Sequence, residues 1–148
     1  YGNNFLLKIL KIISKKKKLT IVNDQVGCIT NVNNLAFIIW NLISYNEKNI
    51  CIPKVLHYSE SGFASWFDIA NKINQYVIER GLINHKTEII PVSSDFLNLP
   101  AKRPRFSLLN CQETYSLFKF IPPNWEDTIT TLLESLDKDY YLNLKNNA

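Results

Sequence analysis

The amino-acid sequence predicts an α/β fold that is rich in helix and contains only a few short strands. Segments with apolar residues at helical spacing alternate along the 148-residue chain with short β-branched runs. A hydrophobic content of 46% is sufficient for one folded domain with a core. No predicted strand leads into a glycine-rich turn, because the chain has only four glycines. The two standard phosphate-binding loops, G-x-G-x-x-G and the P-loop, cannot be written anywhere in it.

The first helix is expected over residues 5–15, after an asparagine pair that can cap its free amide groups. Four lysines, Lys15 to Lys18, follow at its C-terminal end, where cations interact favourably with the helix dipole. A basic amphipathic helix of this kind can lie on a membrane surface, but so wide an apolar face favours burial in a core. That face contains Phe5, Leu6, Ile9, Leu10 and Ile13.

The next segments alternate between strand and helix. A short strand is expected at 19–23, followed by a polar loop over 24–30 that contains a single glycine. The helix expected at 33–44 is apolar on nearly every side, which predicts that it is buried. The run KVLHYS at 54–59 predicts another strand.

The clearest helix signal lies at 65–81. Ser65 and Asp68 form a variant of the capping box, and Gly81 supplies a left-handed stop. A further short strand is expected at 88–92.

Two helices are expected towards the C-terminal end. One covers 110–118, and the other is capped by Asn124 and closes a domain of residues 1–136. Residues 137–148 form a polar tail, which is expected to fray.

Composition and charge exclude several classes of function. The formal net charge of +4 comes partly from the single lysine run, so it gives no reason to expect nucleic acid. No apolar run reaches the ~18 residues that a membrane span needs. The three cysteines and two histidines stand in no metal-ligand spacing. We therefore expect no metal, and reduced thiols in a cytoplasmic protein.

No catalytic residue can be identified in this chain. The G-x-S-x-G nucleophile motif does not occur, and no serine or cysteine is accompanied by an evident base. Tyr115 with Lys119, and Tyr141 with Lys145, match the Y-x-x-x-K pattern of short-chain reductases. Because the chain contains seven tyrosines and many lysines, such matches are expected by chance, and we assign catalysis to neither pair.

A cationic loop at 98–110, NLPAKRPRFSLLN, is the first candidate for binding an anion. Pro104 stiffens the backbone and favours an extended conformation for Arg103. A guanidinium held in this way presents a fork that suits two phosphate oxygens, and Lys102 and Arg105 add positive charge. Solvated surface cations are the alternative interpretation.

Two further segments can contribute to a ligand site. GNNF places the free amide groups of a helix start beside two carboxamides, Asn3 and Asn4, where a phosphate can bind. In the loop NDQVGCIT, Gly27 allows a flat ring to approach, and Gln25 can reach the edge of a base. Taken singly, each segment is also explained by an ordinary cap or turn.

Six motifs together give the sequence a resemblance to a known family. They are GNNF, NDQVGCIT, LAFII, VLHYSESGFASWFDIA, AKRPRFSLLN and PPNWEDTI, and they span nearly the whole chain. Their order and spacing resemble the C-terminal, substrate-binding half of dTDP-4-dehydrorhamnose reductases, which are NADPH-dependent and of the extended short-chain type. The resemblance implies a Rossmann-type protein whose nucleotide-binding half and catalytic residues precede GNNF. The chain is then expected to be a fragment that is inactive by itself.

The resemblance also implies a ligand, a cofactor and a set of substrate-binding residues. Arg103 corresponds to an arginine that contacts pyrophosphate in related sugar-nucleotide enzymes. The ligand is a dTDP-sugar, and the cofactor is NADPH, held mainly by the N-terminal half. The reaction is reduction of dTDP-4-dehydro-L-rhamnose (dTDP-6-deoxy-L-lyxo-4-hexulose) to dTDP-L-rhamnose, for surface polysaccharide. The implied substrate-binding residues are Asn3, Asn4, Gln25, Gly27, Thr30 and Arg103.

Departures from the family pattern leave alternatives open. Ile29, Asn34 and Phe106 replace the usual proline, aspartate and asparagine, which leaves the loop shapes open. Asn33 and Ser135 stand where some members carry magnesium-binding carboxylates, so we expect no magnesium. The resembled family also includes the β subunit of methionine adenosyltransferase, so a non-catalytic partner-binding subunit is one alternative, and a degraded remnant is another. Because the first two helices are so apolar, we expect self-association or contact with the missing half.

Overall fold

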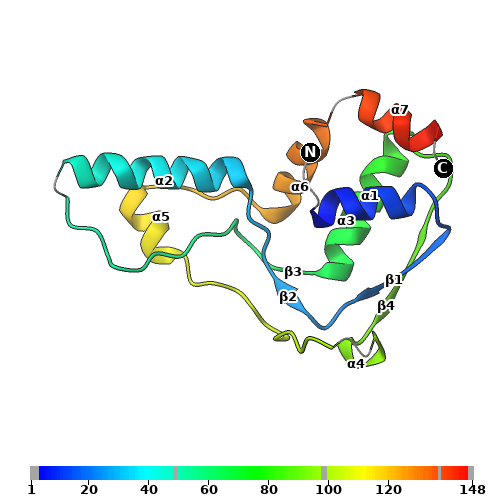
Figure 1. Ribbon diagram of the computed structural model, residues 1–148, viewed down its shortest axis with the longest axis horizontal. Helices are drawn as coiled ribbons and strands as arrows, with labels where there is room; N and C mark the ends of the chain where they lie inside the picture. The colour runs from blue at the N-terminus through cyan, green and yellow to red at the C-terminus, as the bar shows by residue number, and fades with distance from the viewer. Residues whose placement is uncertain (1–3, 49, 98–99, 137, 147–148) are drawn as a thin grey trace.

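The computed structural model describes residues 4–48, 50–97, 100–136 and 138–146. Within these ranges the chain forms seven helices and four short strands, which confirms the predicted helix-rich α/β class (Figure 1). The helices are α1 (Phe5–Ile13), α2 (Val32–Glu47), α3 (Trp66–Glu79), α4 (Ser94–Leu97), α5 (Gln112–Phe118), α6 (Trp125–Glu134) and α7 (Lys138–Asn146). The strands are β1 (Lys18–Val22), β2 (Val26–Gly27), β3 (Ala64–Ser65) and β4 (Glu88–Val92).

Strands β1 and β4 pair in parallel. Their register aligns Lys18 with Glu88 at one end and Val22 with Val92 at the other. Parallel strands are stable when other elements cover them. Here α1 and α3 pack against each other, and both also contact β1.

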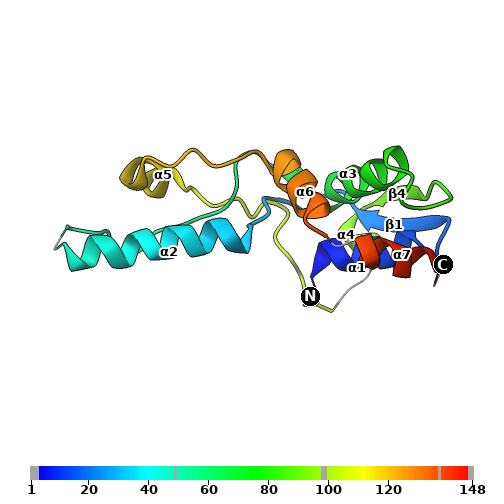
Figure 2. The same ribbon diagram turned by 90° about the horizontal axis from the view of Figure 1, so that it is seen from above.

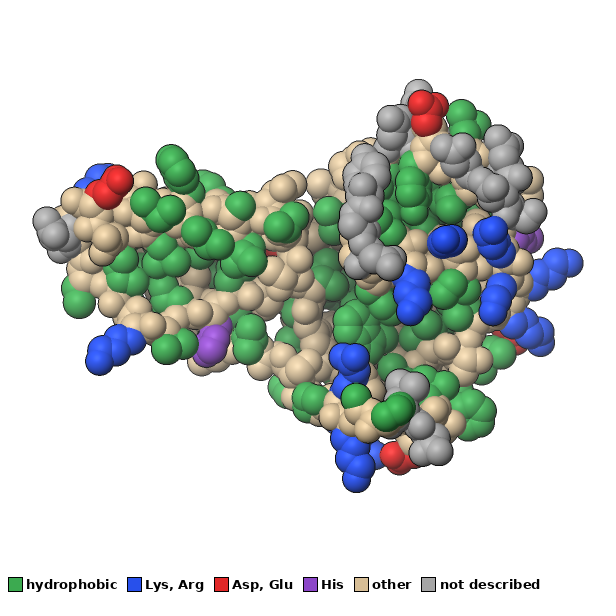
Figure 3. All heavy atoms as spheres, viewed as in Figure 1, with side chains coloured by type: hydrophobic (Ala, Val, Ile, Leu, Met, Phe, Trp, Pro, Cys, Tyr) green, Lys and Arg blue, Asp and Glu red, His purple; other side chains and the backbone are tan. Residues whose placement is uncertain are grey.

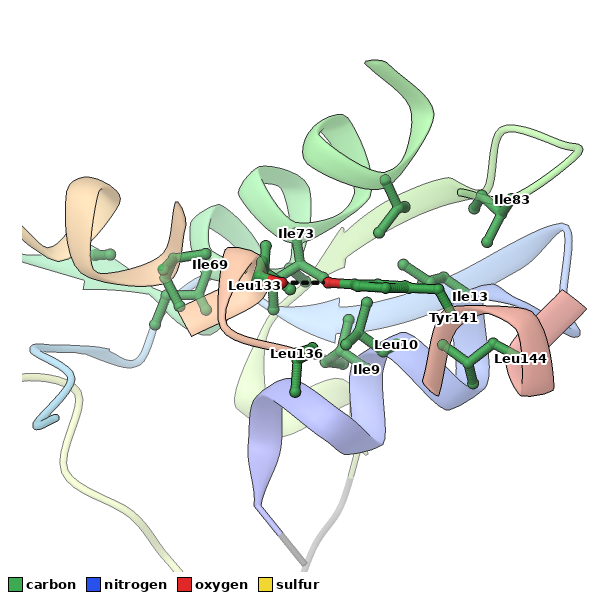
Figure 4. Close-up of a cluster of buried hydrophobic side chains, with 14 residues drawn as sticks. Ile9, Leu10, Ile13, Ile69, Ile73, Ile83, Leu133, Leu136, Tyr141 and Leu144 are labelled. Carbon is green, nitrogen blue, oxygen red and sulfur yellow. Dashed lines mark hydrogen bonds between the residues drawn. The ribbon is translucent and has the colours of Figure 1, made fainter. Parts of the chain in front are cut away.

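The hydrophobic core lies where α1, α3, α6 and α7 meet (Figure 4). The apolar residues of α1 recur at helical spacing, so Ile9, Leu10 and Ile13 are buried while Lys8 and Lys11 stay exposed. The predicted packing of this helix in the core is therefore confirmed.

Local capping signals define α3. The Ser65 hydroxyl accepts a hydrogen bond from the backbone N–H of Asp68 at 3.1 Å, and the Ser65 N–H donates to the Asp68 carboxylate at 2.9 Å. Gly81 follows the helix with a φ of 62°, in the left-handed region that favours glycine. Asn124 caps α6 through the N–H of Glu126. These caps confirm the predicted starts of both helices.

Helices α2 and α5 project from the rest of the molecule as an arm, which we call the α2–α5 arm (Figures 1 and 2). The hydroxyl of Tyr45 in α2 donates to the carbonyl of Leu117 at 3.3 Å, and its ring centroid lies 5.1 Å from that of Phe118. At the start of α2, the backbone N–H of Asn31 donates to the buried carboxylate of Glu60 at 3.0 Å. Helix α2 is thus held at its start by Glu60 and near its end by α5.

Two predictions for residues 32–59 are wrong. Ile38 is the one buried residue of α2, whereas Phe37 and Trp40 are exposed, and hydrophobic side chains gather over the arm in Figure 3. The segment 54–59, predicted as a strand, has no strand assignment in the structure. An apolar helix is buried, and a short run with strand-like composition becomes a strand, only where a second element lies against it. In the described ranges, the α5 segment covers only part of α2, and no strand lies beside 54–59.

Residues 138–146, which belong to the segment predicted as a polar tail, form α7. Tyr141 and Leu144, one helical turn apart, are buried in the core. The hydroxyl of Tyr141 donates to the carbonyl of Leu133 at 2.6 Å (Figure 4). Among the described residues, no helix is sufficiently long and apolar to pass through a lipid bilayer.

Candidate functional site

The predicted cationic loop is anchored to β2 through its backbone. The N–H of Val26 donates to the carbonyl of Arg105 at 2.8 Å, and the N–H of Ser107 donates to the carbonyl of Val26 at 2.9 Å. On its other side β2 pairs with β3, where Val26 lies opposite Ser65. The segment 24–30, expected from the sequence to be a polar loop, therefore contains the short strand β2 between two partners that are distant in sequence.

Gly27 permits this close approach. A Cβ atom added at Gly27 would lie 2.8 Å from the Oγ atom of Ser107. That hydroxyl donates a hydrogen bond to the carbonyl of Val26 at 3.3 Å. The requirement for glycine is steric, because Gly27 does not adopt a positive φ.

A pocket of about 190 Å³, which we call the aromatic pocket, lies between β2, the start of α3 and the cationic loop. Trp66, Ile69 and Ile29 form an apolar wall. Phe5 of α1 supports this wall, because its ring centroid lies 4.5 Å from that of Trp66. The remaining lining includes Gln25, Gly27, Cys28, Arg103 and Ser107.

A second pocket of about 420 Å³, which we call the cationic pocket, shares Gln25 and Arg103 with the first. Lys102 and Arg105 also line it, together with Asp95. In the part of the chain that the structure describes, neither Arg103 nor Lys102 forms an ion pair. Their positive charges are therefore available to an anionic ligand.

Asp24 connects the cationic loop to α4. Ser94 donates to Asp24 through its backbone N–H at 2.9 Å and through its hydroxyl at 2.7 Å. These hydrogen bonds, with a smaller contribution from Arg105, lower the pKa of Asp24 below its ordinary value of 3.8. The guanidinium of Arg105 lies 4.0 Å from Asp24 and 3.6 Å from Asp95. Within the described chain, Arg105 is thus paired and Arg103 is not.

The structure brings together three of the residues predicted for the site. Gln25, Gly27 and Arg103 all line the aromatic pocket, although the arginine is 78 positions from the glutamine in sequence (103 minus 25). The pocket also contains the Cys28 thiol, which donates to the carbonyl of Glu60 at 3.0 Å. Burial raises the pKa of this thiol, so Cys28 stays protonated and neutral.

Asn4 and Thr30, two further predicted site residues, line neither pocket. Asn4 caps α1, because its side chain accepts a hydrogen bond from the N–H of Leu7 at 2.9 Å. Thr30 is exposed at the surface. Asn3 lies outside the described residues. The helix start instead contributes through the ring of Phe5, which supports the pocket wall.

Sequence analysis missed Trp66, Ser94 and Ser107 as members of the site. Trp66 directly follows the helix cap Ser65, and an aromatic residue at such a position beside a predicted loop is a signal that could have identified it. Ser94 and Asp24 are 70 positions apart, so no local pattern joins them. Only the parallel pairing of β1 with β4 brings their strand ends together.

Both tyrosines of the Y-x-x-x-K matches donate their hydroxyl hydrogens to backbone carbonyls. The hydroxyl of Tyr115 donates to the carbonyl of Ser59 at 2.9 Å, and burial raises its pKa above the ordinary value. The hydroxyl of Tyr141 is bound in the same way to the carbonyl of Leu133. Among the residues with described positions, no three His, Cys, Asp or Glu side chains form a group that could hold a metal ion.

Comparisons with known proteins agree with these features. Residues 1–138 match the family model of the RmlD substrate binding domain. The chain is 26% identical to dTDP-4-dehydrorhamnose reductase of Sinorhizobium fredii, over 92% of this chain and 46% of that protein. It is 25% identical to the Escherichia coli protein of the same name, over 91% of this chain and 45% of the relative. It is also 29% identical to the spore coat polysaccharide biosynthesis protein SpsK of Bacillus subtilis, over 90% of this chain and 42% of that protein.

Solved structures show the same fold. The dTDP-4-dehydrorhamnose reductase of Bacillus anthracis, in complex with NADP, matches with a TM-score of 0.78 and 28% identity, over 92% of this chain and 44% of that one. The Clostridium acetobutylicum protein of this name matches with a TM-score of 0.71 and 28% identity, over 90% of this chain and 45% of that one. The chain thus spans about half the length of the relatives it matches, and the resemblance inferred from the motifs is confirmed. It belongs to the RmlD substrate binding domain family.

Proposed function

We propose that residues 1–136 form the domain that binds the dTDP-sugar substrate of a dTDP-4-dehydrorhamnose reductase. The observation that carries this proposal is the guanidinium of Arg103, which lines both the aromatic pocket and the cationic pocket and forms no ion pair with the described residues. A nucleoside diphosphate has the matching chemistry, because it joins a flat ring to two phosphates. The description of the family and the names of the relatives support this choice of ligand.

The two pockets divide the ligand between them. The base lies in the aromatic pocket against Trp66, and the diphosphate lies in the cationic pocket beside Arg103 and Lys102. Each charge-assisted hydrogen bond contributes ~1.5 to 3 kcal/mol, and an aromatic contact contributes ~0.5 to 1.5 kcal/mol. These energies are suited to holding and orienting the sugar nucleotide.

The reduction itself is assigned to the whole reductase. When bound to the whole reductase, NADPH would supply the hydride for reduction of the 4-keto group, and a related structure contains NADP. The residues of this chain do not fit a dinucleotide, because its four glycines form no G-x-G-x-x-G cradle. We therefore assign binding and orientation of substrate to this chain, with no step of hydride or proton transfer, and we expect the chain alone to be inactive.

The proposal is tested by calorimetric titration of dTDP into the 148-residue chain and into the Arg103→Ala variant. Loss of the charge-assisted contacts should weaken dTDP binding by about tenfold to a hundredfold. The matched control is Arg80→Ala, because Arg80 caps the C-terminal end of α3 and pairs with Glu134 at the surface. Binding of dTDP that is equally strong in all three proteins, or that is absent in the unmodified chain, would contradict the proposal.

We also propose that the outer face of α2 is a protein interface. The helix contains no charged residue from Val32 to Asn46. Phe37 and Ile43 are exposed on it, and Trp40 keeps 70% of its surface exposed. Contiguous apolar surface of this kind marks contact sites. For the isolated chain the available partner is a second copy, so we expect self-association.

Light scattering across a concentration series measures this association. Trp40→Glu should shift the chain towards monomer, because a carboxylate would be buried in the contact. Phe96→Glu is the control, since Phe96 is 71% exposed but lies on α4, far from α2 (Figure 1). An unmodified chain that stays monomeric at high concentration would refute the interface.

A further inference from the structure

The side-chain amide of Gln25 is oriented by a directed chain of hydrogen bonds. The Ser94 hydroxyl lies 2.7 Å from a carboxylate oxygen of Asp24, which can only accept, so the serine hydrogen points to Asp24. The same oxygen of Ser94 lies 2.8 Å from Gln25. With its single hydrogen already used, Ser94 must accept there, and the atom of Gln25 that faces it must be the donor Nε2.

This arrangement leaves the carbonyl oxygen of Gln25 as a fixed acceptor. Gln25 keeps only 8% of its surface exposed, and its Oε1 receives no hydrogen bond from any residue that the structure describes. This oxygen is nevertheless not fully buried. The described side-chain nitrogen and oxygen atoms that are both buried and without a hydrogen-bond partner belong to Asn74, His85 and Thr128, and none belongs to Gln25. Gln25 lines both the aromatic pocket and the cationic pocket.

Two neighbouring donors in the aromatic pocket, Cys28 and Ser107, do not compete for this acceptor. The Cys28 thiol donates to the carbonyl of Glu60, and the Ser107 hydroxyl donates to the carbonyl of Val26. Their hydrogens are therefore directed to the backbone. A base that enters the pocket beside Trp66 meets the Gln25 carbonyl as an oriented acceptor that lacks a donor.

We propose that Gln25 selects the base by accepting a hydrogen bond from the imide N3–H of a pyrimidine-dione, the ring of thymine and uracil. In this ring N3 carries a hydrogen, whereas N3 of cytosine carries a lone pair, which would face the Gln25 oxygen with no hydrogen between them. A buried acceptor that has no partner disfavours the wrong ligand. This inference rests on the proposed function, and it identifies Gln25 as the specificity-determining residue and Ser94 as a positioning residue.

The test is calorimetric titration of the 148-residue chain with dTDP, dUDP and dCDP. The three ligands carry the same sugar and diphosphate, and the comparison of dUDP with dCDP excludes the thymine methyl group. In the unmodified chain, dTDP and dUDP should bind more tightly than dCDP by about tenfold or more. Gln25→Leu should bring dUDP and dCDP to similar affinities, and Gln75→Leu, the same change on the exposed face of α3, should keep the preference.

Ser94→Ala provides a second variant that keeps Gln25 itself. Without the serine oxygen the amide can rotate and offer Nε2 to N3 of cytosine, so the preference for dUDP should fall while dCDP binding improves. Equal binding of dUDP and dCDP by the unmodified chain would overturn the inference and leave the proposed function intact. A preference that survives Gln25→Leu would also overturn it. If none of the three ligands binds, the inference and the proposed function fail together.

Discussion

Substitution of Gly27 by alanine tests how the cationic loop is held against β2. The added Cβ would lie 2.8 Å from the Ser107 Oγ atom, a distance at which one of the two groups must move. Overpacking typically costs ~1 to 3 kcal/mol, and we expect the lower part of this range because a serine hydroxyl can rotate. Rotation breaks the 3.3 Å hydrogen bond to Val26, which adds about 0.5 kcal/mol. The expected loss in the free energy of unfolding is therefore about 1.5 to 2 kcal/mol.

A double-mutant cycle identifies the responsible contact. Ser107→Ala alone should cost about 0.5 kcal/mol, the value of its long hydrogen bond. In the double variant Gly27→Ala/Ser107→Ala the steric conflict disappears, so its stability should be close to that of Ser107→Ala. Urea unfolding followed by circular dichroism measures all four proteins, and dTDP titration reports whether Arg103 is displaced. If the two substitutions add with no coupling, the contact with Ser107 is not the reason that glycine is required.

Three further predictions concern groups that hold the fold. Because the folded pKa of Asp24 lies below 3.8, this carboxylate stabilises the fold above that pH and loses its contribution as pH falls through the folded pKa. The variant Asp24→Asn should therefore show a smaller decline of the urea unfolding midpoint in acid. An unchanged decline would count against this role of Asp24. Glu60 is 2% exposed, and its carboxylate accepts hydrogen bonds from Asn31 and Tyr58. Glu60→Leu should therefore lower the free energy of unfolding by about 3 kcal/mol, and Glu60→Gln by about 1 kcal/mol. Equal losses in the two variants would show that the hydrogen bonds are unimportant. Leu133 is fully buried, and Leu133→Ala should lower unfolding free energy by about 3 kcal/mol, whereas a loss below 1 would place it outside the core.

Short sequence motifs correctly predicted those helices whose ends are fixed by contacts between residues close in sequence. The capping box of Ser65 with Asp68 and the glycine stop at Gly81 place α3 within a residue or two of the observed helix. The α1 face that the sequence assigns to the core is buried in the structure. In each case the deciding interactions join residues that are close in sequence, so a short window contains the necessary information.

Elements that depend on distant partners were not predictable. The run at 54–59 has strand composition but no strand beside it, and α2 has a core-like composition but little cover. The pairing of Arg105 with Asp24 joins residues 81 positions apart (105 minus 24), so the sequence could not distinguish this cation from Arg103. Such contacts are set by tertiary packing.

The central claim is that the base and the diphosphate of one nucleotide occupy the two adjoining pockets that share Gln25 and Arg103. Titration of unlabelled dTDP into the ¹⁵N-labelled chain, followed by amide chemical shifts, tests this claim most directly. The largest shifts should fall on residues 25–29 and 102–107 and on the indole N–H of Trp66. Shifts that gather instead at Ser59 and Cys111, which line a separate pocket, would contradict it.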